Sequence, residues 1–273
     1  MKSKKSFTLI ELLVVIVIIG ILAGVIMIST SASIDKASIA KGQVFSSTVK
    51  EELLSNTLAE WTFDNLSQSA GTALPEDTTI EDEWGNFDGL SKGGPVVRDS
   101  DNCIKGKCLE FSSTYDWAEV SNFSIGNSVT VSFWGKNSNY SPSMPFSFNG
   151  DNYSYGPDLY FVGTNINWNT GDGNNNYILN TGLPNTNWHH FVLINDEFNG
   201  VKLYIDGVKV GRTASYRSVL TTSNIFYIAR YDNGGYYFNG LIDEFVIYDT
   251  ALSAKQVHDL YAYYFNLALI NYE

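Results

Sequence analysis

The carboxylate of Glu11 has the most unusual surroundings of any ionisable group in this 273-residue sequence. It is the only ionisable side chain in the 22 residues from Phe7 to Ile28, which are otherwise apolar or small. A carboxylate inside hydrocarbon is costly, so an acid at such a position is expected to have a function and a partner of opposite charge. The alternative is that the side chain only extends to a nearby membrane interface.

Cys103 and Cys108 are the only cysteines, and Gly106 between them suits a tight turn. Two cysteines that flank a tight turn can meet at disulfide distance across a hairpin, and an extracytoplasmic domain would keep them oxidised. Two reduced thiols are the alternative. A metal site is disfavoured because two further ligands with suitable spacing are not evident.

The sequence is acidic, with 29 Asp and Glu residues, 17 Lys and Arg residues and a formal net charge of −12. Three of the basic residues, Lys2, Lys4 and Lys5, lie in the first six positions, so the remaining chain has 14 basic and 29 acidic residues, a charge of −15. Such a chain repels phosphate backbones, which disfavours direct nucleic-acid binding. Its carboxylates suit a hard cation such as calcium.

The element that must position Glu11 is a helix, because the apolar run 7–28 is long enough to span a bilayer. The lysines of the leader 1–6 keep that end in the cytoplasm and direct the rest of the chain outward. Beyond Ile28 apolar residues recur at helical spacing, so the helix is expected to continue to about Asn56. A conventional secretory signal, cleaved after the run near small residues such as Ala23, is the alternative.

The stretch Lys5-Ser6-Phe7-Thr8-Leu9-Ile10-Glu11-Leu12-Leu13 closely resembles the processing signal of type IV prepilins and pseudopilins. The resemblance implies that a prepilin peptidase cuts between Ser6 and Phe7, methylates the new amine and leaves the helix on the mature protein. It also implies that Glu11 pairs with the Phe7 amine of a neighbouring subunit during assembly. The residue before the cut is usually Gly in that family, and here it is Ser6.

From Glu60 onward, short runs rich in Val, Ile, Phe, Tyr and Thr alternate with clusters of Gly, Asn, Asp and Pro, which is typical of an all-β domain. Asp206-Gly207 separates two alternating runs and predicts a two-residue hairpin turn with apolar side chains on one face. Ser253-Ala254-Lys255-Gln256 is a capping box, which predicts a short helix ending near Tyr264. The clearest predicted strands are Val129 to Trp134, Leu159 to Val162, His189 to Ile194, Val201 to Ile205 and Asn224 to Ala229.

Six segments occur in the same order as in the laminin-G-like, concanavalin A-like lectin family, and the resemblance spans about residues 60–262. It implies a two-sheet jelly roll and does not fix a ligand. The predicted chain is therefore a long N-terminal α-helix (7–56, with the transmembrane segment 7–28), then an all-β jelly-roll sandwich with a short C-terminal helix (60–264). The six segments begin at Glu60, Gly106, Val129, Trp188, Leu203 and Phe238.

Members of that lectin family often hold calcium near the start of the domain. The resemblance carries the ligands onto Asp82 and Asn86 in one loop and onto Asp243 in the last strand motif, and calcium is the expected cofactor. Oxygen ligands from two distant segments suit this ion. The alternative is that Asp243 only makes local caps or salt bridges and the acidic loop is solvated.

Glucanases share this architecture, but an enzymatic role is not expected. The acids Glu81, Asp82 and Glu83 lie in a loop, and the adjacent Asp243 and Glu244 would point to opposite faces of a strand. His189 and His190 are assigned structural roles, because the strand pattern already explains them.

Exposed aromatic residues could stack on sugar rings, and Trp168, Tyr236 and Tyr237 are the candidates for glycan binding. A Tyr-rich loop that packs internally or faces another subunit is the alternative.

These features favour a subunit of a type IV pilus or similar filament, made with an inner-membrane assembly platform from copies of itself or other pilins. It would sit first in the cytoplasmic membrane and then on the cell surface, where the sandwich domain serves adhesion or carbohydrate binding. The alternatives are a pseudopilin of a type II secretion system and a membrane-anchored lectin that does not polymerise.

Overall fold

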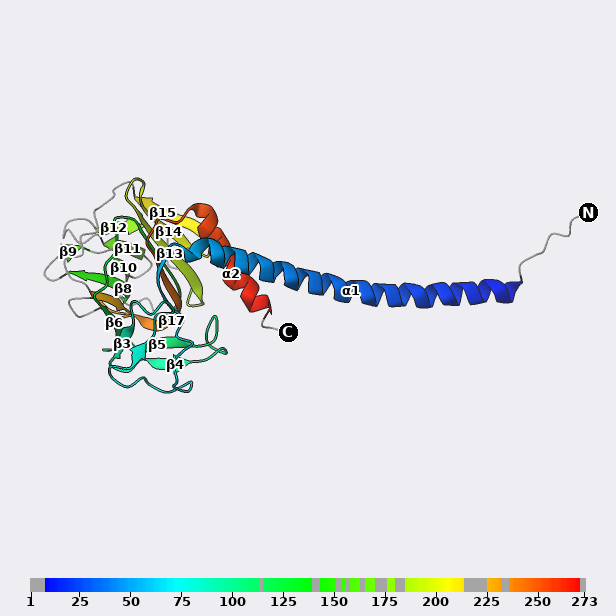
Figure 1. Cartoon of the computed structure of the whole chain (residues 1–273), viewed down its shortest axis with the longest axis horizontal. Coiled ribbons are helices and arrows are strands. Elements are labelled where there is room, and N and C mark those ends of the chain that lie inside the picture. The colour runs from blue at the N-terminus through cyan, green and yellow to red at the C-terminus, as the bar shows by residue number, and fades with distance from the viewer. Residues whose placement is uncertain are drawn as a thin grey trace, which may run out of the picture.

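The computed structural model describes residues 8–112, 115–138, 143–150, 154–155, 158–162, 165–169, 176–179, 185–213, 225–231 and 236–270. Within these ranges, side chains are described except at 24–41, 43, 46, 149–150, 154–155, 162, 168–169, 176–179, 212–213 and 265–270. A single long helix leads into a β-sandwich, and a second helix crosses the first where it meets the sandwich (Figure 1).

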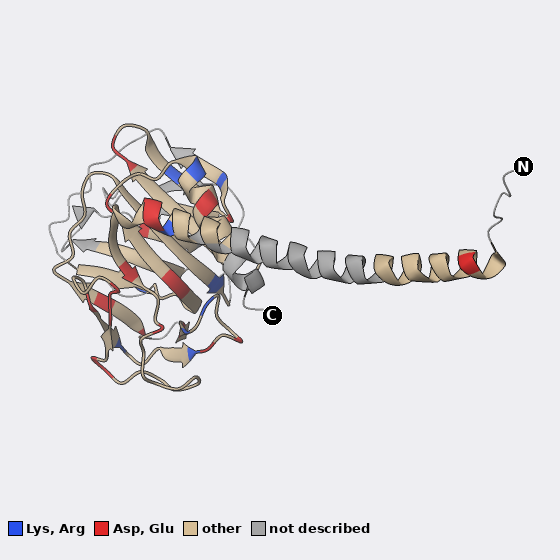
Figure 2. Cartoon of the chain, turned by 45° about the vertical axis from the view of Figure 1, so that its right-hand side comes forward, with Lys and Arg blue, Asp and Glu red and all other residues tan. Residues whose placement is uncertain are grey.

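Helix α1 (Leu9–Leu54) has 46 residues, about 70 Å at 1.5 Å per residue, and its end agrees with the predicted boundary near Asn56. Its first described turns, up to Leu22, present exposed apolar side chains with the acidic Glu11 among them (Figure 2). Within the part of the chain that the structure describes, no helix contains a stretch that is both long and apolar enough to cross a membrane.

The sandwich consists of two antiparallel sheets. In the first, hydrogen-bonded neighbours follow the order β15-β14-β13-β7-β17-β5-β4, and β1 also pairs with β17. Its strands are β1 (Thr57–Trp61), β4 (Val96–Arg98), β5 (Cys108–Ser112), β7 (Val129–Asn137), β13 (His189–Asp196), β14 (Gly200–Ile205), β15 (Val208–Thr213) and β17 (Asn239–Tyr248).

The second sheet follows the order β12-β11-β10-β8-β16-β6-β3-β2, and β9 pairs with β8. Its strands are β2 (Thr79–Ile80), β3 (Gly89–Lys92), β6 (Trp117–Ser121), β8 (Ser143–Gly150), β9 (Ser154–Tyr155), β10 (Asp158–Val162), β11 (Asn165–Asn169), β12 (Asn176–Leu179) and β16 (Ile225–Ile228). The jelly-roll sandwich predicted from the sequence is confirmed, and so are its five clearest strands, within a few residues at each end.

The main core lies between the two sheets and is rich in aromatic rings. Trp61 is fully buried and stacks on Phe226 with ring centroids 5.8 Å apart, and Phe133 stacks on Phe245 at 5.3 Å. Aromatic side chains of this size supply most of the apolar area that a two-sheet core must bury.

A second apolar cluster covers the outer face of the first sheet. Val49 and Leu53 from the end of α1, and Val257 and Leu260 from helix α2 (Ala254–Ile270), pack there against Val192 and its neighbours. The two helices therefore lie on the first sheet, and the second sheet forms the opposite side of the domain (Figure 1).

The local signals at α2 and at the β14–β15 turn are mostly confirmed. Ser253 Oγ accepts the N–H of Gln256 at 3.2 Å and Gln256 Oε1 accepts the N–H of Ser253 at 2.9 Å, as in a capping box, but α2 continues beyond Tyr264 to Ile270. Asp206 and Gly207 both have positive φ, 51° and 74°, as a two-residue hairpin turn requires.

The apolar side chains of this hairpin share one face, as predicted. Val201, Leu203 and Ile205 lie in the main core, and Val210 of β15 packs against it. Val208 pairs with Ile205 next to the turn, on the edge strand of the sheet, and is 64% exposed.

Candidate functional site

Glu11 has a structural role as part of a helix cap. Thr8 is the N-cap of α1: its N–H donates to Glu11 Oε2 at 2.8 Å, its hydroxyl donates to the same oxygen at 2.7 Å, and the Glu11 N–H donates to Thr8 Oγ1 at 3.3 Å. This is a reciprocal capping box, which the Thr-x-x-Glu spacing could have predicted. Ser6 and Phe7 lie outside the described residues.

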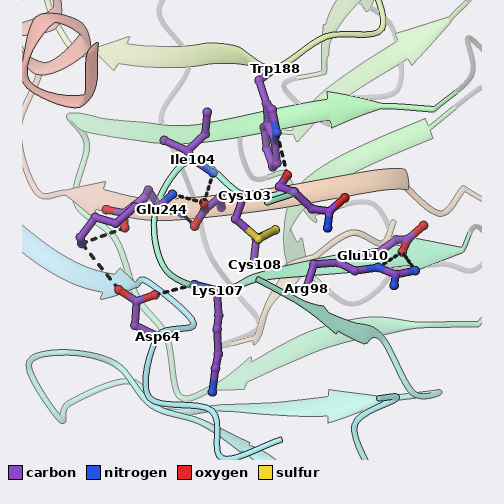
Figure 3. Close-up of a disulfide and its surroundings, with 12 residues drawn as sticks. Asp64, Arg98, Cys103, Ile104, Lys107, Cys108, Glu110, Trp188 and Glu244 are labelled. Carbon is purple, nitrogen blue, oxygen red and sulfur yellow. Dashed lines mark hydrogen bonds and ion pairs between the residues drawn. A yellow bond between two sulfur atoms is a disulfide. The ribbon is translucent and has the colours of Figure 1, made fainter. Parts of the chain in front are cut away.

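Cys103 and Cys108 form a disulfide with their Cα atoms 5.5 Å apart, but the predicted hairpin geometry is wrong. The residue opposite Cys108 in the β4–β5 pair is Arg98, and Cys103 lies inside the connection 99–107 between these strands. The bond therefore closes a small loop at the start of β5 and does not link two paired strands. Figure 3 shows this loop beside the β17 strand. We call residues 103–108 the disulfide loop.

The disulfide loop binds the carboxylate of Asp243, which is fully buried in β17. Asp243 Oδ2 accepts the N–H groups of Ile104 at 2.8 Å and Lys105 at 3.1 Å, and Oδ1 accepts the N–H of Glu244 at 2.7 Å. Burial raises the pKa of Asp243, the neighbouring Glu244 raises it further, and the three N–H donors lower it only in part.

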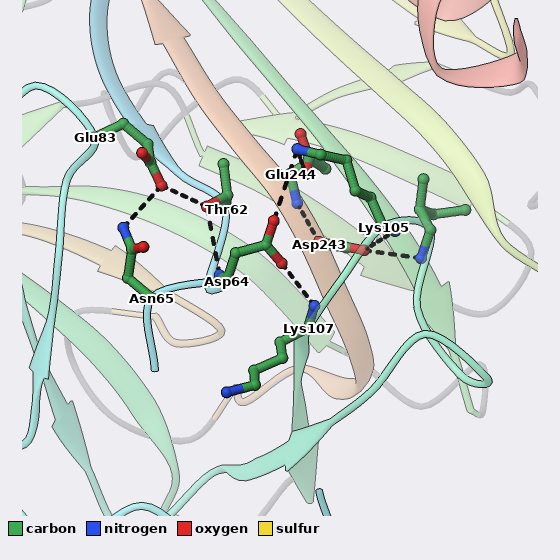
Figure 4. Close-up of polar contacts among 9 residues, drawn as sticks. Thr62, Asp64, Asn65, Glu83, Lys105, Lys107, Asp243 and Glu244 are labelled. Atoms are coloured by element: carbon green, nitrogen blue, oxygen red, sulfur yellow. Dashed lines mark hydrogen bonds and ion pairs between the residues drawn. The ribbon is translucent and has the colours of Figure 1, made fainter. Parts of the chain in front are cut away.

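The ammonium group of Lys105 pairs with Glu244, the residue after Asp243. The side chain of Glu244 is 2% exposed. Lys105 Nζ lies 3.0 Å from Glu244 Oε1 and 3.7 Å from Asp64 Oδ2 (Figure 4). Burial alone would lower the pKa of Lys105, but the two carboxylates raise it overall. Burial also raises the pKa of Glu244, and Lys105 opposes that shift.

Gly106 allows the disulfide loop to approach Asp64. The Lys107 N–H donates to Asp64 Oδ1 at 2.7 Å, and Gly106 has φ of 49°. A Cβ at position 106 would lie 1.8 Å from that same oxygen, so a larger residue would have to displace the Asp64 carboxylate and adopt a positive φ.

In the structure, the predicted calcium ligands take part in hydrogen bonds that involve backbone N–H groups. Asp82 is 4% exposed, and its carboxylate accepts the N–H groups of Glu60, Asn86 and Phe87 at 2.8, 3.1 and 3.2 Å. Asn86 contributes its backbone N–H, and its side chain is exposed.

These contacts do not fit a calcium ion. The carboxylates of Asp82 and Asp243 each face three N–H hydrogens, where calcium would need converging oxygen atoms. Within the described residues, the only group of three or more His, Cys, Asp or Glu ligand atoms joins Asp243 to Cys103 and Cys108, whose sulfurs already form the disulfide. Calcium binding stays a prediction, for which an ion would have to displace these hydrogen bonds.

A polar cavity of about 390 Å³ lies where α1 meets the sandwich, lined by residues that include Lys50, Glu60, Glu83, Trp84 and Lys105. Burial raises the pKa of Glu60; Lys50 lowers it, and the carboxylate of Glu83 raises it again. The cavity therefore combines carboxylates and ammonium groups next to the attachment point of the helix.

An aromatic surface lies on the outer face of the second sheet. Ala118 and Val120 of β6 face the core, so the alternating Trp117 points outward, and so do Tyr227 of β16 and Tyr160 of β10. The Arg230 guanidinium lies 4.2 Å from the ring centre of Trp117 and 5.2 Å from that of Tyr227, which are cation–π distances.

Tyr236 and Tyr237, two of the predicted candidates for glycan binding, border this surface beside Tyr160 and Trp117. The Tyr236 ring is 40% exposed and lies 5.1 Å from Tyr160, whose pKa burial and the Tyr236 hydrogen bond raise to about 12. Tyr237 packs 5.6 Å from Tyr115, which is 71% exposed. The side chain of Trp168 lies outside the described residues. Sequence reasoning missed the outward-facing residues of β6, although the alternation in Trp117-Ala-Glu-Val could have indicated them.

The two adjacent histidines have structural contacts. His189 Nδ1 lies 2.6 Å from Asp206 Oδ2 at the β14–β15 turn, and His190 Nε2 lies 2.8 Å from Ser132 Oγ in the neighbouring strand. Asp206 Oδ1 also accepts the His190 N–H at 2.9 Å, so this carboxylate fixes the start of β13.

Two family models match the chain. The concanavalin A-like lectin/glucanases superfamily matches residues 112–258, and the prokaryotic N-terminal methylation motif matches residues 1–27. No curated protein has significant sequence similarity to the chain.

Several solved structures share the fold. Domain 4 of AbnA, a GH43 extracellular arabinanase from Geobacillus stearothermophilus, solved with arabinotriose, is 22% identical with a TM-score of 0.58, over 75% of this chain and 98% of that one. The botulinum neurotoxin serotype D binding domain (18%, TM-score 0.57) and the Paraclostridial mosquitocidal protein 1 binding domain (18%, 0.56) each match 77% of this chain, which covers only 52% of theirs. At these identities the likeness shows the fold alone.

Proposed function

The chain belongs to the concanavalin A-like lectin/glucanases superfamily and carries a prokaryotic N-terminal methylation motif, and from this premise we propose that it is a subunit of a type IV pilus or similar filament that displays a carbohydrate-binding sandwich. The observation that carries the proposal is that α1 and the aromatic surface lie on opposite sides of the sandwich. Helix α1 joins the outer face of the first sheet, and the aromatic surface lies on the outer face of the second sheet.

The N-terminal part of the proposal follows the methylation motif. Prepilin peptidase cuts between Ser6 and Phe7, the segment 7–28 anchors the chain in the cytoplasmic membrane, and an inner-membrane assembly platform moves the subunit into the filament. In the filament, the amine of Phe7 pairs with Glu11 of a neighbouring subunit. Such a pair neutralises two charges in an apolar setting, which favours one axial register.

The contacts of Glu11 suggest how this pairing is reached. Before assembly, Thr8 supplies two donors to Glu11 Oε2, so the carboxylate has local hydrogen bonds. Assembly then adds the neighbouring amine, whose full charge makes a stronger hydrogen bond with the carboxylate than a neutral donor does. The cap thus holds Glu11 in a defined position until a partner arrives.

Display of the sandwich follows from its attachment. Val49 and Leu53 of α1 and Leu260 of α2 are buried against the first sheet, so this side of the domain faces the helix and, in a filament, the shaft. The second sheet then faces outward (Figure 1).

The aromatic surface supports carbohydrate as the ligand. Tyr and Trp rings present flat apolar faces with polar edges, which suit the C–H faces and hydroxyl groups of sugars. The exposed Tyr115 packs against Tyr237, which also lies 6.1 Å from Trp117, and the exposed Tyr236 packs against Tyr160. One structural relative was solved with arabinotriose, and the cell entry of another, botulinum neurotoxin type C, depends on interaction with two ganglioside molecules.

The proposal is for binding and not for catalysis. Paired carboxylates of a glycosidase must flank a sugar, whereas Asp243 and Glu244 are buried and engaged by the disulfide loop.

Assembly is tested with Glu11→Val in cells that lack any wild-type copy. Valine makes the segment more apolar, so insertion and cleavage are expected to be intact while sheared filaments lose the subunit. Glu51→Val, on the exposed sandwich end of α1, is the matched control and should enter filaments normally. Filaments that contain Glu11→Val at the wild-type level would refute the charge-pairing mechanism.

The same experiment separates the alternative functions. Long surface filaments that contain this chain, identified by electron microscopy and mass spectrometry, support the pilus subunit. A chain found only in short periplasmic assemblies supports a pseudopilin, and a chain that stays in the membrane fraction supports a membrane-anchored lectin.

Carbohydrate binding is tested on a glycan array with the full chain in detergent. Tyr236→Ala and Tyr237→Ala should each weaken binding about twofold to twelvefold, the effect of about 0.5–1.5 kcal/mol for an aromatic contact. Phe198→Ala is the control, because Phe198 is 87% exposed on the β13–β14 connection. Binding that all three variants retain would refute the assignment of the site.

A further inference from the structure

We infer that the Lys105 ammonium, held by the disulfide loop, is the cation that balances the buried Glu244 and the nearby Asp64, next to Asp243, where calcium was expected. The displayed domain then depends on the oxidised Cys103–Cys108 bond and does not depend on a divalent ion. The inference concerns this cluster alone and is independent of the proposed function.

A bulge in β17 creates the need for a cation. The pairing of β17 with β7 shifts register between Asp243 and Val246, and Glu244 has φ of 47°. β17 pairs with β5 through residues 239–242 and with β1 through residues 245–248. Both acids therefore lie in the gap between β5 and β1, and both are buried.

The disulfide loop fills that gap with hydrogen-bond donors and one ammonium group. Two loop N–H groups bind Asp243, and Lys105 Nζ binds Glu244 at 3.0 Å (Figures 3 and 4). The ionisable groups that face Lys105 are Glu244, Asp64 and, at longer range, Glu60 and Tyr263. One lysine thus supplies positive charge to carboxylates from two separate segments, which is the role that a bridging calcium ion would have.

The disulfide keeps this lysine in place. Cys108 is fully buried at the start of β5, so its bond to Cys103 anchors both ends of the loop that carries Lys105. Further hydrogen bonds hold the loop, among them those from the Lys107 N–H to Asp64 Oδ1 and from Trp188 Nε1 to the carbonyl of the adjacent Asn102, at 2.7 and 2.9 Å. Reduction releases the Cys103 end, and a buried Glu244 without its cation strongly destabilises a folded domain.

The cluster also bears on the attachment of the helices. Glu244 hydrogen-bonds with Tyr264 of α2, and Glu60, next to the cluster, lines the same cavity as Lys50 of α1. Loss of the loop cation is therefore expected to loosen the junction between the helices and the sandwich, as well as the gap itself.

The test measures the melting temperature of the full chain in detergent, with added calcium or with chelator, and with or without a thiol reductant. We expect no difference between calcium and chelator, and a clear fall on reduction. A melting temperature that rises with calcium would overturn the inference and would support the calcium site.

Variants of Lys105 separate the charge from the loop closure. Lys105→Met should lower the melting temperature by on the order of 10 °C, and Lys105→Arg should restore most of the loss. Lys92→Met removes a lysine paired with Glu76 and Asp77, whose side chains are about 60% exposed, and as the control it should change little.

Combining the two perturbations tests their coupling. If the disulfide acts by holding Lys105, reduction lowers the melting temperature less in Lys105→Met than in the wild type. Equal falls in both proteins would show that the bond acts only by closing a loop, and would overturn the inference. If Lys105→Met does not fold, the calcium and chelator comparison on the wild type still decides between the two cations.

Discussion

Because the His190 side chain is buried, we predict that the folded protein loses stability in mild acid. Its imidazole is fully buried in β13 beneath α2, 5.2 Å from the ring of Trp134 and 5.9 Å from that of Tyr264. Nε2 meets Ser132 Oγ, and Nδ1 has no hydrogen-bond partner within the described residues. Burial lowers the pKa of His190 from its ordinary value of 6.5 to about 3, because the apolar surroundings disfavour the charged ring.

The sign and size of the effect follow from proton linkage. Because the folded pKa is lower than the unfolded one, the unfolded chain takes up the proton first, and stability is lost as the pH falls below about 6.5. Between pH 7 and pH 5 the loss is about 2 kcal/mol. The result changes little for any folded pKa below about 4, since at pH 5 only the unfolded state is then protonated.

The assay compares urea unfolding of the full chain in detergent at pH 7 and pH 5, for the wild type and for His190→Gln. Glutamine places a neutral polar group near Ser132 and cannot titrate, so the variant should lack about 2 kcal/mol of the pH-dependent loss. His258→Gln is the control, because this histidine is exposed on α2. If His190→Gln and the wild type lose the same free energy on acidification, the buried neutral imidazole is the wrong explanation.

Three further predictions concern other residues. The mature chain should begin with N-methylated Phe7, and intact-mass analysis that finds a start at Ala23 or later would contradict the pilin motif. Glu60→Gln should unfold at a higher urea concentration than the wild type at pH 7 but not at pH 4.5. Burial raises the pKa of Glu60 in the folded state, so the charged carboxylate lowers stability above the unfolded-state pKa. An equal difference at both pH values would contradict this. Gly106→Ala should lower the free energy of unfolding by about 1–3 kcal/mol, because residue 106 has a positive φ and a Cβ there would contact Asp64. The control is Gly126→Ala, where a Cβ meets nothing within 4 Å. Equal stability of the two variants would show that the loop adapts.

The sandwich could be predicted because its strands have local signals. Turn residues such as Asp206-Gly207 and the capping box at Ser253 act over a few positions, and both are present in the structure. The bulge at Glu244 could not be predicted, because it results from the competition of β5 and β1 for one edge of β17. Such a competition between distant segments leaves no local pattern.

The partners of Asp243 were hidden for a related reason. A sequence shows carboxylates, and acids in matching positions suggest a cation that binds them. The donors in the structure are mostly backbone N–H groups of the disulfide loop, and every residue except proline has one. Only the position of Lys105 inside the loop was specific, and its pairing with a residue 139 positions away depends on the fold.

The division of the domain into a covered and an open face, in contrast, was present in the sequence. In β13 the run Phe191-Val-Leu-Ile194 is apolar without interruption, and a strand that is apolar on both sides must be covered on both. In β6 the residues that point away from the core are Trp117 and Glu119, which tolerate water on that side. Packing a helix on the sheet that contains β13 therefore buries apolar side chains, whereas β6 offers no such apolar outer face. The same alternation that attaches the domain to α1 places aromatic side chains on the outer face of the second sheet, where we propose that a carbohydrate binds.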